Sequence, residues 1–436
     1  MTEKPHRFIL DIRNKLCAIP VGFKYPKHLS ITQRSGTVKR KYALLIGVLQ
    51  IFLMNTLLGF AQEEVSIQSR AAVLMEFDYG KILWSKNPHM KTPPASITKL
   101  MTYHLAMDAV EAGKIRLEDR VTISEKAAAE RGTSYNLKAG DVVSLKNLMD
   151  AMMIVSGNDA AYAIAEYVGG SAESFVEQMN GEAKRLGMKD TTFVNPNGMP
   201  TEGTENITTA WDMAILSQYL IDRYGKDLIP ITSSWSFIDP ERNFIKDNTN
   251  MLLKELPKVD GLKTGFTNAA GYCLSSTMKV ASQGEGTSDF RLIAVVLGAQ
   301  NDRQRVADSK KLLEYGALNY SKQGIIKMGD IVETYHWWNM EPLEIGLTVK
   351  EDVLVFGPKE GAIKQQEVFM FPGARLPIEK GQQLGEMVLT LYDDSKMYVE
   401  LVSDRDLKRI PIGLRVLKWW WDFSGFMVTL LEHFVG

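Results

Sequence analysis

The chain has 436 residues, of which 51 are Lys or Arg and 52 are Asp or Glu, and its formal net charge is −1. This length is enough for more than one domain, and the near-neutral balance lacks the positive excess of a nucleic-acid-binding protein. Only two cysteines occur, Cys17 and Cys273. We expect a membrane or a cleavage site to separate them, so no intrachain disulfide framework is predicted.

The N-terminal part has the pattern of an export signal. Ten basic and only two acidic residues come before the run 43–60, which is almost wholly apolar and ends in the small-residue stretch Gly59-Phe60-Ala61. This predicts a basic extension over 1–42 and, over 43–61, a secretory signal peptide cleaved before Gln62. The alternative is an uncleaved membrane segment, since the run is just long enough to span a bilayer. In both cases the positive-inside rule places the rest of the chain on the outer, periplasmic side of the cytoplasmic membrane.

The first candidate for chemistry is Ser96-Ile97-Thr98-Lys99, which follows a β-hairpin predicted around Asp78-Tyr79-Gly80. Pro93 and Pro94 stop extended chain, and apolar residues then recur at helical spacing to Leu105. Residues three apart share a helix face, so the Ser96 hydroxyl and the Lys99 amine can come within hydrogen-bonding distance. A serine becomes a nucleophile when a neighbour takes its proton, and a lysine does so if burial or another cation lowers its pKa.

The Ser-x-x-Lys pattern is weak by itself because the chain contains it twice. The second copy, Ser276-Thr277-Met278-Lys279, lies in a predicted strand, where residues three apart point to opposite faces. A second polar motif, Ser156-Gly157-Asn158, lies between a helix predicted over 144–155 and the helix that follows it. Two packed helices would present both polar side chains. The alternative is an N-cap and a turn, and Ser134-Tyr135-Asn136 repeats the Ser-x-Asn pattern in a loop.

Further candidates lie in a polar loop and a strand. Residues 193–208 form a predicted loop rich in Asn, Pro, Gly and Thr, and long loops of this kind often contribute to a site. Lys263-Thr264-Gly265 is the only Lys-Thr-Gly in the sequence, and it precedes two strand-like runs. Lys263 and Gly265 would face one side of a strand, where Gly265 allows close approach of a substrate backbone and Lys263 holds an anionic group. The alternative is an ordinary strand end.

The pattern changes after a helix predicted from Asp302 to Tyr320. Short strand-like runs separated by turns over 322–410 predict a small all-β domain. The last stretch, 411–436, has a narrow polar stripe at helical spacing beside Trp419-Trp420-Trp421. We predict an amphipathic helix that binds the membrane surface peripherally, since acidic residues within it argue against spanning. The alternative is a terminal helix packed on its own domain.

The three motifs occur in the order Ser96-x-x-Lys99, Ser156-Gly157-Asn158 and Lys263-Thr264-Gly265. This set resembles that of the low-molecular-weight penicillin-binding proteins, which are serine D-alanyl-D-alanine carboxypeptidases of the penicillin-binding protein 5 and 6 type. In the second motif this chain has Gly where the pattern has Asp. The resemblance covers nearly all of residues 71–320. It implies an α+β fold, with a transpeptidase-like domain of antiparallel sheet and helices over 62–321 followed by the β domain and the anchor helix.

The resemblance also implies an acyl-enzyme mechanism that needs no cofactor and no metal. Ser96 would attack the carbonyl between the two terminal D-alanines of a peptidoglycan stem peptide, Lys99 would take its proton, and Ser156 would pass a proton to the leaving amine. β-Lactam antibiotics would acylate the same serine. The N–H groups of Ser96 and Phe266 would form the oxyanion hole, while Thr264 and Arg303 would bind the terminal carboxylate. The residues implied to hold the substrate are Asn158, Lys263, Thr264, Gly265, Phe266 and Arg303, with Arg305 two residues beyond the last.

Other functions fit the same sequence. A β-lactamase needs a glutamate for fast deacylation, and Glu202 has the required spacing to an Asn in the polar loop, whereas Glu177 is one residue too close to its Asn. A D,D-endopeptidase acting on wall crosslinks would use the same catalytic residues. The alternative outside the enzymes is a membrane-tethered binding protein of wall synthesis with a vestigial Ser96 site. The intact motifs argue against that alternative.

Overall fold

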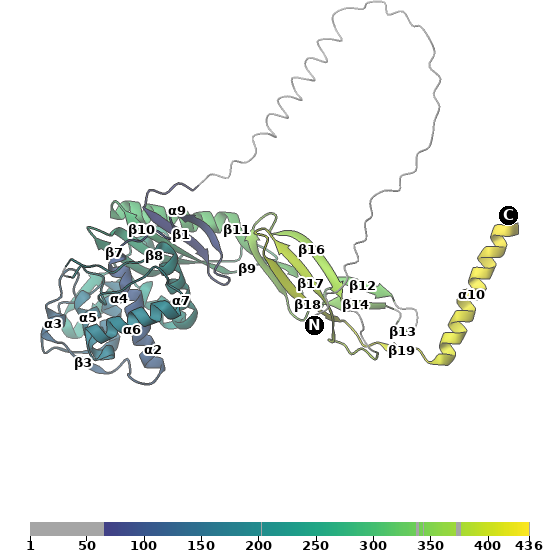
Figure 1. Ribbon diagram of the computed structural model, residues 1–436, viewed down its shortest axis with the longest axis horizontal. Helices are drawn as coiled ribbons and strands as arrows, with labels where there is room; N and C mark the ends of the chain where they lie inside the picture. The colour runs from purple at the N-terminus through teal and green to yellow at the C-terminus, as the bar shows by residue number, and fades with distance from the viewer. Residues whose placement is uncertain (1–64, 202, 337–339, 343, 372–375, 436) are drawn as a thin grey trace, which may run out of the picture. The chain divides into compact units, whose positions relative to one another are not determined.

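The computed structural model describes the chain from residue 65 to residue 435, except for residues 202, 337–339, 343 and 372–375. The basic extension predicted over 1–42 and the signal segment predicted over 43–61 lie outside these residues. All elements below belong to the unit Val65–Gly436. In chain order, a region of mixed helices and strands precedes an all-β region and a last helix (Figure 1). The predicted α+β fold is therefore confirmed.

A five-stranded antiparallel sheet forms the centre of the first region, in the spatial order β2-β1-β10-β8-β7. Its strands in chain order are β1 (Ala71–Glu76), β2 (Ile82–Lys86), β7 (Val259–Thr267), β8 (Gly271–Val280) and β10 (Phe290–Ala299). The first two strands form the predicted hairpin. In the middle of the sheet Ala71 of β1 lies opposite Leu297 of β10, so both ends of this region meet there. Strand β7 is left at an edge.

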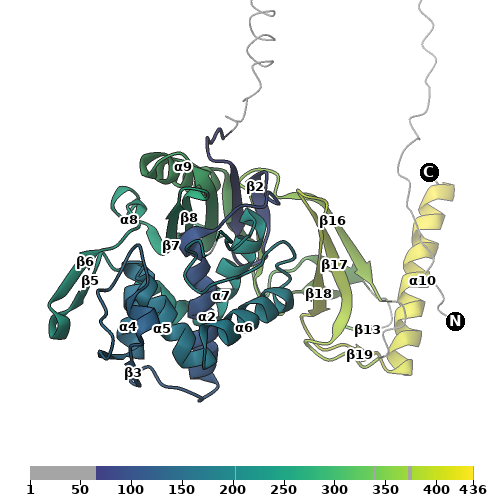
Figure 2. The same cartoon turned by 60° about the vertical axis from the view of Figure 1, so that its left-hand side comes forward.

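Both faces of the sheet are buried. Side chains along each strand point alternately to one face and to the other. In β1, Val73 and Met75 pack into one hydrophobic cluster, and Ala72 and Leu74 pack into another cluster. Helix α7 (Ala210–Thr232) covers the first face, with α2 (Lys99–Glu111) packed against it, and α9 (Asp302–Asn319) covers the second face (Figures 1 and 2). The region thus has a sheet between two helical layers.

The other helices of this region pack around α2. They are α4 (Leu145–Ile154), α5 (Asn158–Gly169) and α6 (Ala172–Arg185). Hydroxyl side chains at the starts of α4, α6 and α7 accept hydrogen bonds from the first-turn backbone, as N-caps do. The short elements are η1 (Ala95–Thr98), β3 (Arg120–Thr122), α3 (Glu125–Ala128), β4 (Val142–Ser144), β5 (Ser236–Asp239), η2 (Pro240–Arg242), β6 (Phe244–Asp247), α8 (Leu252–Glu255) and β9 (Thr287–Ser288).

The predicted all-β region is built from antiparallel strands. The larger sheet has the order β12-β14-β18-β17-β16, and β11 pairs with β15 and β9 in a second sheet. A separate hydrophobic cluster, with Leu347, Met387 and Leu401 among its fully buried members, holds this region together. The strands are β11 (Tyr320–Ile326), β12 (Glu333–His336), β13 (Met340–Glu341), β14 (Glu344–Thr348), β15 (Val353–Pro358), β16 (Ile363–Met370), β17 (Gln383–Leu391), β18 (Lys396–Ser403) and β19 (Lys408–Arg409).

The last element is helix α10 (Ile412–Val435). Large apolar side chains along it are exposed, and Trp421 is the most exposed of them at 81 %. Within the part of the chain that the structure describes, no helix is both long enough and apolar enough to cross a membrane.

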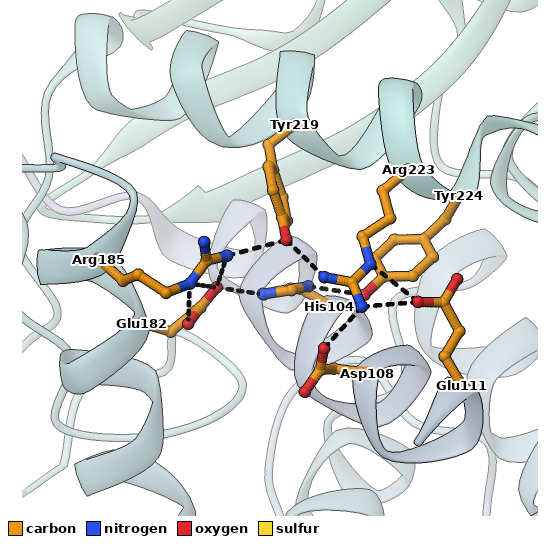
Figure 3. Close-up of polar contacts among 8 residues, drawn as sticks. All are labelled: His104, Asp108, Glu111, Glu182, Arg185, Tyr219, Arg223 and Tyr224. Carbon is orange, nitrogen blue, oxygen red and sulfur yellow. Dashed lines mark hydrogen bonds and ion pairs between the residues drawn. The ribbon is translucent and has the colours of Figure 1, made fainter. Parts of the chain in front are cut away.

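A polar network crosses three helices of the first region (Figure 3). His104 of α2 is buried, with Nε2 2.6 Å from Glu182 Oε1 of α6 and Nδ1 3.2 Å from the Tyr224 hydroxyl of α7. Burial lowers the pKa of His104 against the opposing effect of Glu182, so we infer a neutral ring that donates from Nε2 and accepts at Nδ1. The network continues through Asp108, Glu111, Arg185, Tyr219 and Arg223.

This network predicts a pH-dependent stability. The folded pKa of His104 lies below its ordinary value of 6.5, so the unfolded chain takes up this proton first as the pH falls. The contribution of the neutral His104 to the free energy of unfolding is therefore fully present above the ordinary pKa of 6.5 and is lost as the pH falls below it. We expect His104→Gln to cost about 1–2 kcal/mol at neutral pH through its lost hydrogen bonds, and to lose less further stability on acidification than the parent.

The measurement is urea unfolding at about pH 7.5 and about pH 5, on either side of the histidine range. His89→Gln is the control, since it removes an exposed histidine that is not part of this network. An unchanged acid loss in His104→Gln would assign that loss to other groups.

Candidate active site

Ser96 lies in the short turn η1, immediately before α2 begins at Lys99. The sequence predicted Ser96 at the start of the helix itself, and the structure instead places a 3₁₀ turn there. Strand β7 runs directly against this turn. A Cβ atom added to Gly265 would lie 2.8 Å from the Pro94 carbonyl oxygen and 2.9 Å from the Ser96 nitrogen. Only glycine allows the strand to come this close to Ser96, so Gly265 sets the distance between β7 and the serine.

Lys99 is the centre of the polar contacts at this site. Its side chain is fully buried, and Nζ lies 2.8 Å from the Ser96 hydroxyl oxygen. Nζ also lies 2.6 Å from Asn158 Oδ1, 3.0 Å from the Asn197 carbonyl oxygen and 3.5 Å from the Ser156 hydroxyl oxygen. The structure therefore brings together Ser96, Lys99, Ser156 and Asn158, as the sequence predicted, and adds Asn197 to them.

Burial lowers the pKa of both lysines of the site, Lys99 and Lys263. It lowers the pKa of Lys99 well below its ordinary value, and the nearby Lys263 lowers it further, while Asp159 and Glu130 act in the opposite direction. Burial, helped by Arg305, lowers the pKa of Lys263 to about 7. A neutral amine beside a hydroxyl is the arrangement that general-base activation of a serine needs.

The Ser156-Gly157-Asn158 junction is fixed by a preceding loop that sequence reasoning did not include. Thr133 Oγ1 donates to the Ser156 carbonyl at 2.6 Å, and the Asn158 backbone N–H donates to the Thr133 carbonyl at 2.8 Å. Asp159 binds the backbone N–H groups of Tyr135 and Leu137. The loop that contains the second Ser-x-Asn, at 134–136, therefore supports the junction at residues 156–159.

Two further residues of the site come from outside the predicted motifs. Asn197, in the polar loop, accepts from Lys99 through its carbonyl, and its side-chain Nδ2 donates to Glu130 Oε2 at 2.8 Å. Gly198 follows with φ of +84°, and a Cβ atom there would lie 1.9 Å from the Ala95 carbonyl oxygen. The asparagine-rich loop was the only sequence signal for these contacts, and nothing in the sequence pointed to Glu130.

Strand β7 supplies the third motif. Lys263 is buried and its Nζ donates to the Thr264 carbonyl at 3.1 Å. The Thr264 hydroxyl lies 2.6 Å from the Thr249 hydroxyl. Phe266 is 47 % exposed and packs against Tyr272 of β8, with the ring centres 4.3 Å apart. Phe266 and Tyr272 therefore form an aromatic surface next to the Lys263-Thr264-Gly265 motif.

A cavity of about 710 Å³ opens beside these residues. Ser96 and Ser156 lie on its wall together with Thr264, Gly265 and Phe266. The rest of the lining is Gly132, Thr133, Met199, Pro200, Glu205, Thr249, Thr267, Asn268, Ala269, Tyr272, Asp302 and Arg305.

The arginine of this cavity is Arg305 and not Arg303. Arg305 is buried on its wall, with Nη1 3.4 Å from the Gly265 carbonyl oxygen and Nη2 paired with Asp302. Arg303 is exposed on the same helix and does not line the cavity. Residues two apart on a helix point in different directions, and the packing of α9 on the sheet turns Arg305 inward. The structure therefore favours Arg305 over Arg303 as the arginine that would bind the terminal carboxylate of a substrate.

The second Ser-x-x-Lys lies as predicted, on two faces of a strand. In β8, Ser276 is buried and donates to the Ala294 carbonyl at 3.1 Å, whereas exposed Lys279 pairs with Asp289 at 2.7 Å. The Ser276 and Lys279 side chains therefore have different partners. Among the described residues, no group of three or more His, Cys, Asp or Glu side chains is arranged to hold a metal ion.

Known proteins resemble both regions of the chain. Residues 59–301 match the peptidase S11 family described as D-alanyl-D-alanine carboxypeptidase, and residues 320–409 match the C-terminal domain of penicillin-binding protein 5. The D-alanyl-D-alanine carboxypeptidase DacF of Bacillus subtilis is 34 % identical, covering 84 % of this chain and 94 % of its own. The D-alanyl-D-alanine carboxypeptidase DacC of Escherichia coli is 36 % identical, covering 90 % and 96 %.

Solved structures of penicillin-binding proteins also resemble the chain. Penicillin-binding protein 5 of Haemophilus influenzae has a TM-score of 0.61 at 30 % identity, covering 79 % of this chain and 98 % of its own. Penicillin-binding protein D2 of Listeria monocytogenes in its ampicillin-bound form has a TM-score of 0.50 at 30 % identity, covering 58 % and 99 %.

The Gly198 contact predicts a large loss of stability on a small substitution. Gly198→Ala should cost more than about 3 kcal/mol, because the new Cβ meets the Ala95 backbone and the turn that carries Ser96 cannot move away freely. Gly140→Ala is a matched control, since Gly140 has the same φ of +84° but nothing within 4 Å of the added Cβ. The control should cost about 1–2 kcal/mol of backbone strain only. Equal losses in urea unfolding would contradict the close contact.

Proposed function

The chain belongs to the D-alanyl-D-alanine carboxypeptidase family, as its motifs indicated, and we propose that Ser96 is the nucleophile of this serine-type activity. The substrate is a peptidoglycan stem peptide that ends in D-alanyl-D-alanine, and the product is free D-alanine. One observation carries the proposal: a fully buried Lys99 amine lies 2.8 Å from the Ser96 hydroxyl oxygen. Burial lowers the pKa of this lysine, so its amine is available to accept the serine proton.

In the acylation step, the Ser96 oxygen attacks the carbonyl between the two D-alanines and Lys99 takes the hydroxyl proton. The C–N bond then breaks, and a proton reaches the leaving amine through Ser156, whose hydroxyl lies 3.5 Å from Lys99 Nζ. Water hydrolyses the resulting ester and restores Ser96. Asn158 and the Asn197 carbonyl keep the amine directed toward Ser96 throughout.

Strand β7 supports the tetrahedral intermediate. It is an edge strand, so alternate backbone N–H groups along it have no sheet partner and are available to a substrate. We assign the oxyanion hole to the N–H groups of Ser96 and Phe266, which the close approach at Gly265 holds near each other. The terminal carboxylate of the substrate meets Thr264 and Arg305, the one cationic side chain on the cavity wall among the described residues.

The proposal predicts a covalent adduct on one serine. Benzylpenicillin should add its mass to the parent protein and not to Ser96→Ala, and Ser96→Ala should lose at least about a thousandfold in D-alanine release, as expected for a lost nucleophile. Intact-mass spectrometry over time is the measurement. Ser276→Ala, from the second Ser-x-x-Lys, is the control and should still form the adduct.

An adduct that persists on Ser96→Ala would overturn the nucleophile assignment. Rapid loss of the adduct together with consumption of penicillin would favour a β-lactamase. The glutamate considered for that activity, Glu202, lies outside the described residues.

A second part of the proposal concerns location. The signal pattern at 43–61 supports export, with residues 62–321 as the catalytic domain and 322–410 as the β domain on the outer side of the cytoplasmic membrane. The exposed apolar side chains of α10 support peripheral anchoring through residues 411–436.

The anchor is tested by replacing its indoles. Changing Trp419, Trp420 and Trp421 together to Ala should weaken vesicle binding at least about tenfold, since each tryptophan buries about 150–250 Å² in an apolar environment. Co-flotation with anionic phospholipid vesicles measures this, and replacement of the exposed Trp235 by Ala, outside α10, is the control. Equal flotation of the triple variant and the parent would remove the anchoring role.

A further inference from the structure

Two carboxylates that the proposed reaction does not use, those of Glu205 and Asp302, lie in the lining of the cavity beside Ser96. Glu205 lies on its wall and is half-buried. The other charged groups of the lining are Asp302 and Arg305, which pair with each other. Within the described residues, no ion pair or hydrogen bond neutralises the Glu205 side chain. Glu205 is therefore the carboxylate of this lining that has no ion-pair partner among the described residues.

The backbone at Glu205 is held close to the turn that carries the nucleophile. The neighbouring Asn206 is buried, and its Nδ2 donates to the Thr98 hydroxyl at 2.9 Å. Its Oδ1 accepts from the backbone N–H of Val194 at 2.7 Å and of Asn195 at 3.1 Å. These contacts hold the backbone beside Glu205 close to the turn that carries Ser96, which gives a recognition residue its support.

Glu205 and Arg305 reach the cavity from different segments of the chain. Arg305 comes from α9 and contacts β7, whereas Glu205 follows Met199 and Pro200 in the polar loop that packs against η1 and α2. A peptide whose terminal carboxylate meets Arg305 extends its N-terminal part away from that end. In this inference, that part of the peptide lies along the polar loop, where Glu205 is found.

We propose that Glu205 binds a cationic amine on the residue that precedes the D-alanyl-D-alanine pair, so that the enzyme selects stem peptides with a free ammonium at that residue. The inference rests on the proposed function, because it uses the same cavity and the same direction of the substrate. A carboxylate recognises an ammonium by charge and by accepting its hydrogen bonds. Acetylation of the amine removes both interactions.

Two synthetic peptides test this with the full chain. Nα-acetyl-L-lysyl-D-alanyl-D-alanine has a free ε-ammonium, and its Nα,Nε-diacetyl form has none. The parent should release D-alanine from the first with a kcat/KM about two- to fivefold higher, the range expected of one partly solvated ion pair. The ratio of the two values does not depend on the fraction of active enzyme in a preparation.

Variants assign the preference to one side chain. Glu205→Gln should bring the ratio close to unity, and Glu205→Lys should reverse it. Glu177→Gln is the matched control, since Glu177 is exposed on α6 away from the cavity lining, and it should keep the parent ratio. A parent ratio near unity, or an unchanged ratio in Glu205→Gln, would overturn the inference and leave the carboxypeptidase proposal intact. No D-alanine release by the parent from either peptide would overturn both.

Discussion

The site depends on one costly arrangement, the burial of the Lys99 amine. An amine out of water needs hydrogen-bond partners around it, and the structure supplies them from three separate segments: Ser96 in η1, Asn158 at the start of α5, and Asn197 in the polar loop. The same burial lowers the pKa of Lys99, so the group that is expensive to enclose is also the group that becomes a base. The junction of α4 and α5 and the polar loop supply partners of this side chain directly, and the 131–137 loop holds Asn158 in place through the Arg131 carbonyl, which accepts from the Asn158 amide.

The sheet determines where the substrate meets that base. Because β1 pairs with β10 in the middle of the sheet, β7 lies at the edge, and its glycine allows it to approach the Ser96 turn. The backbone of an edge strand accepts an extended peptide in the way that it would accept a further strand. Lys263 of the same strand is buried and does not line the cavity, so it leaves room for the substrate. The topology and the absence of one side chain at Gly265 thus create the binding groove.

The sequence identified the parts of the site that local rules control. Ser96 and Lys99 are one turn apart, and Ser156 and Asn158 lie at a junction between two helical patterns, so periodicity was enough to place them. Asn197 and Glu130 were missed because their contacts with Lys99 and with each other join segments that only the tertiary fold brings together. The choice of Arg303 over Arg305 failed for a related reason. A weakly amphipathic helix does not reveal which of its faces packs on the sheet, and α9 has a charged residue on almost every side.

The residues in and around this cavity differ in how deeply they are buried. Lys99, Lys263 and Arg305 are buried, and their positions are fixed by contacts with the backbone and with neighbouring side chains. Phe266 and Glu205 are partly exposed and contribute little to that internal packing. A change in one of these inner groups disturbs the groups on other elements to which it is hydrogen-bonded. A change in an outer group alters mainly what the cavity attracts. Substrate preference in this fold is therefore adjustable at the wall without rebuilding the base beneath it.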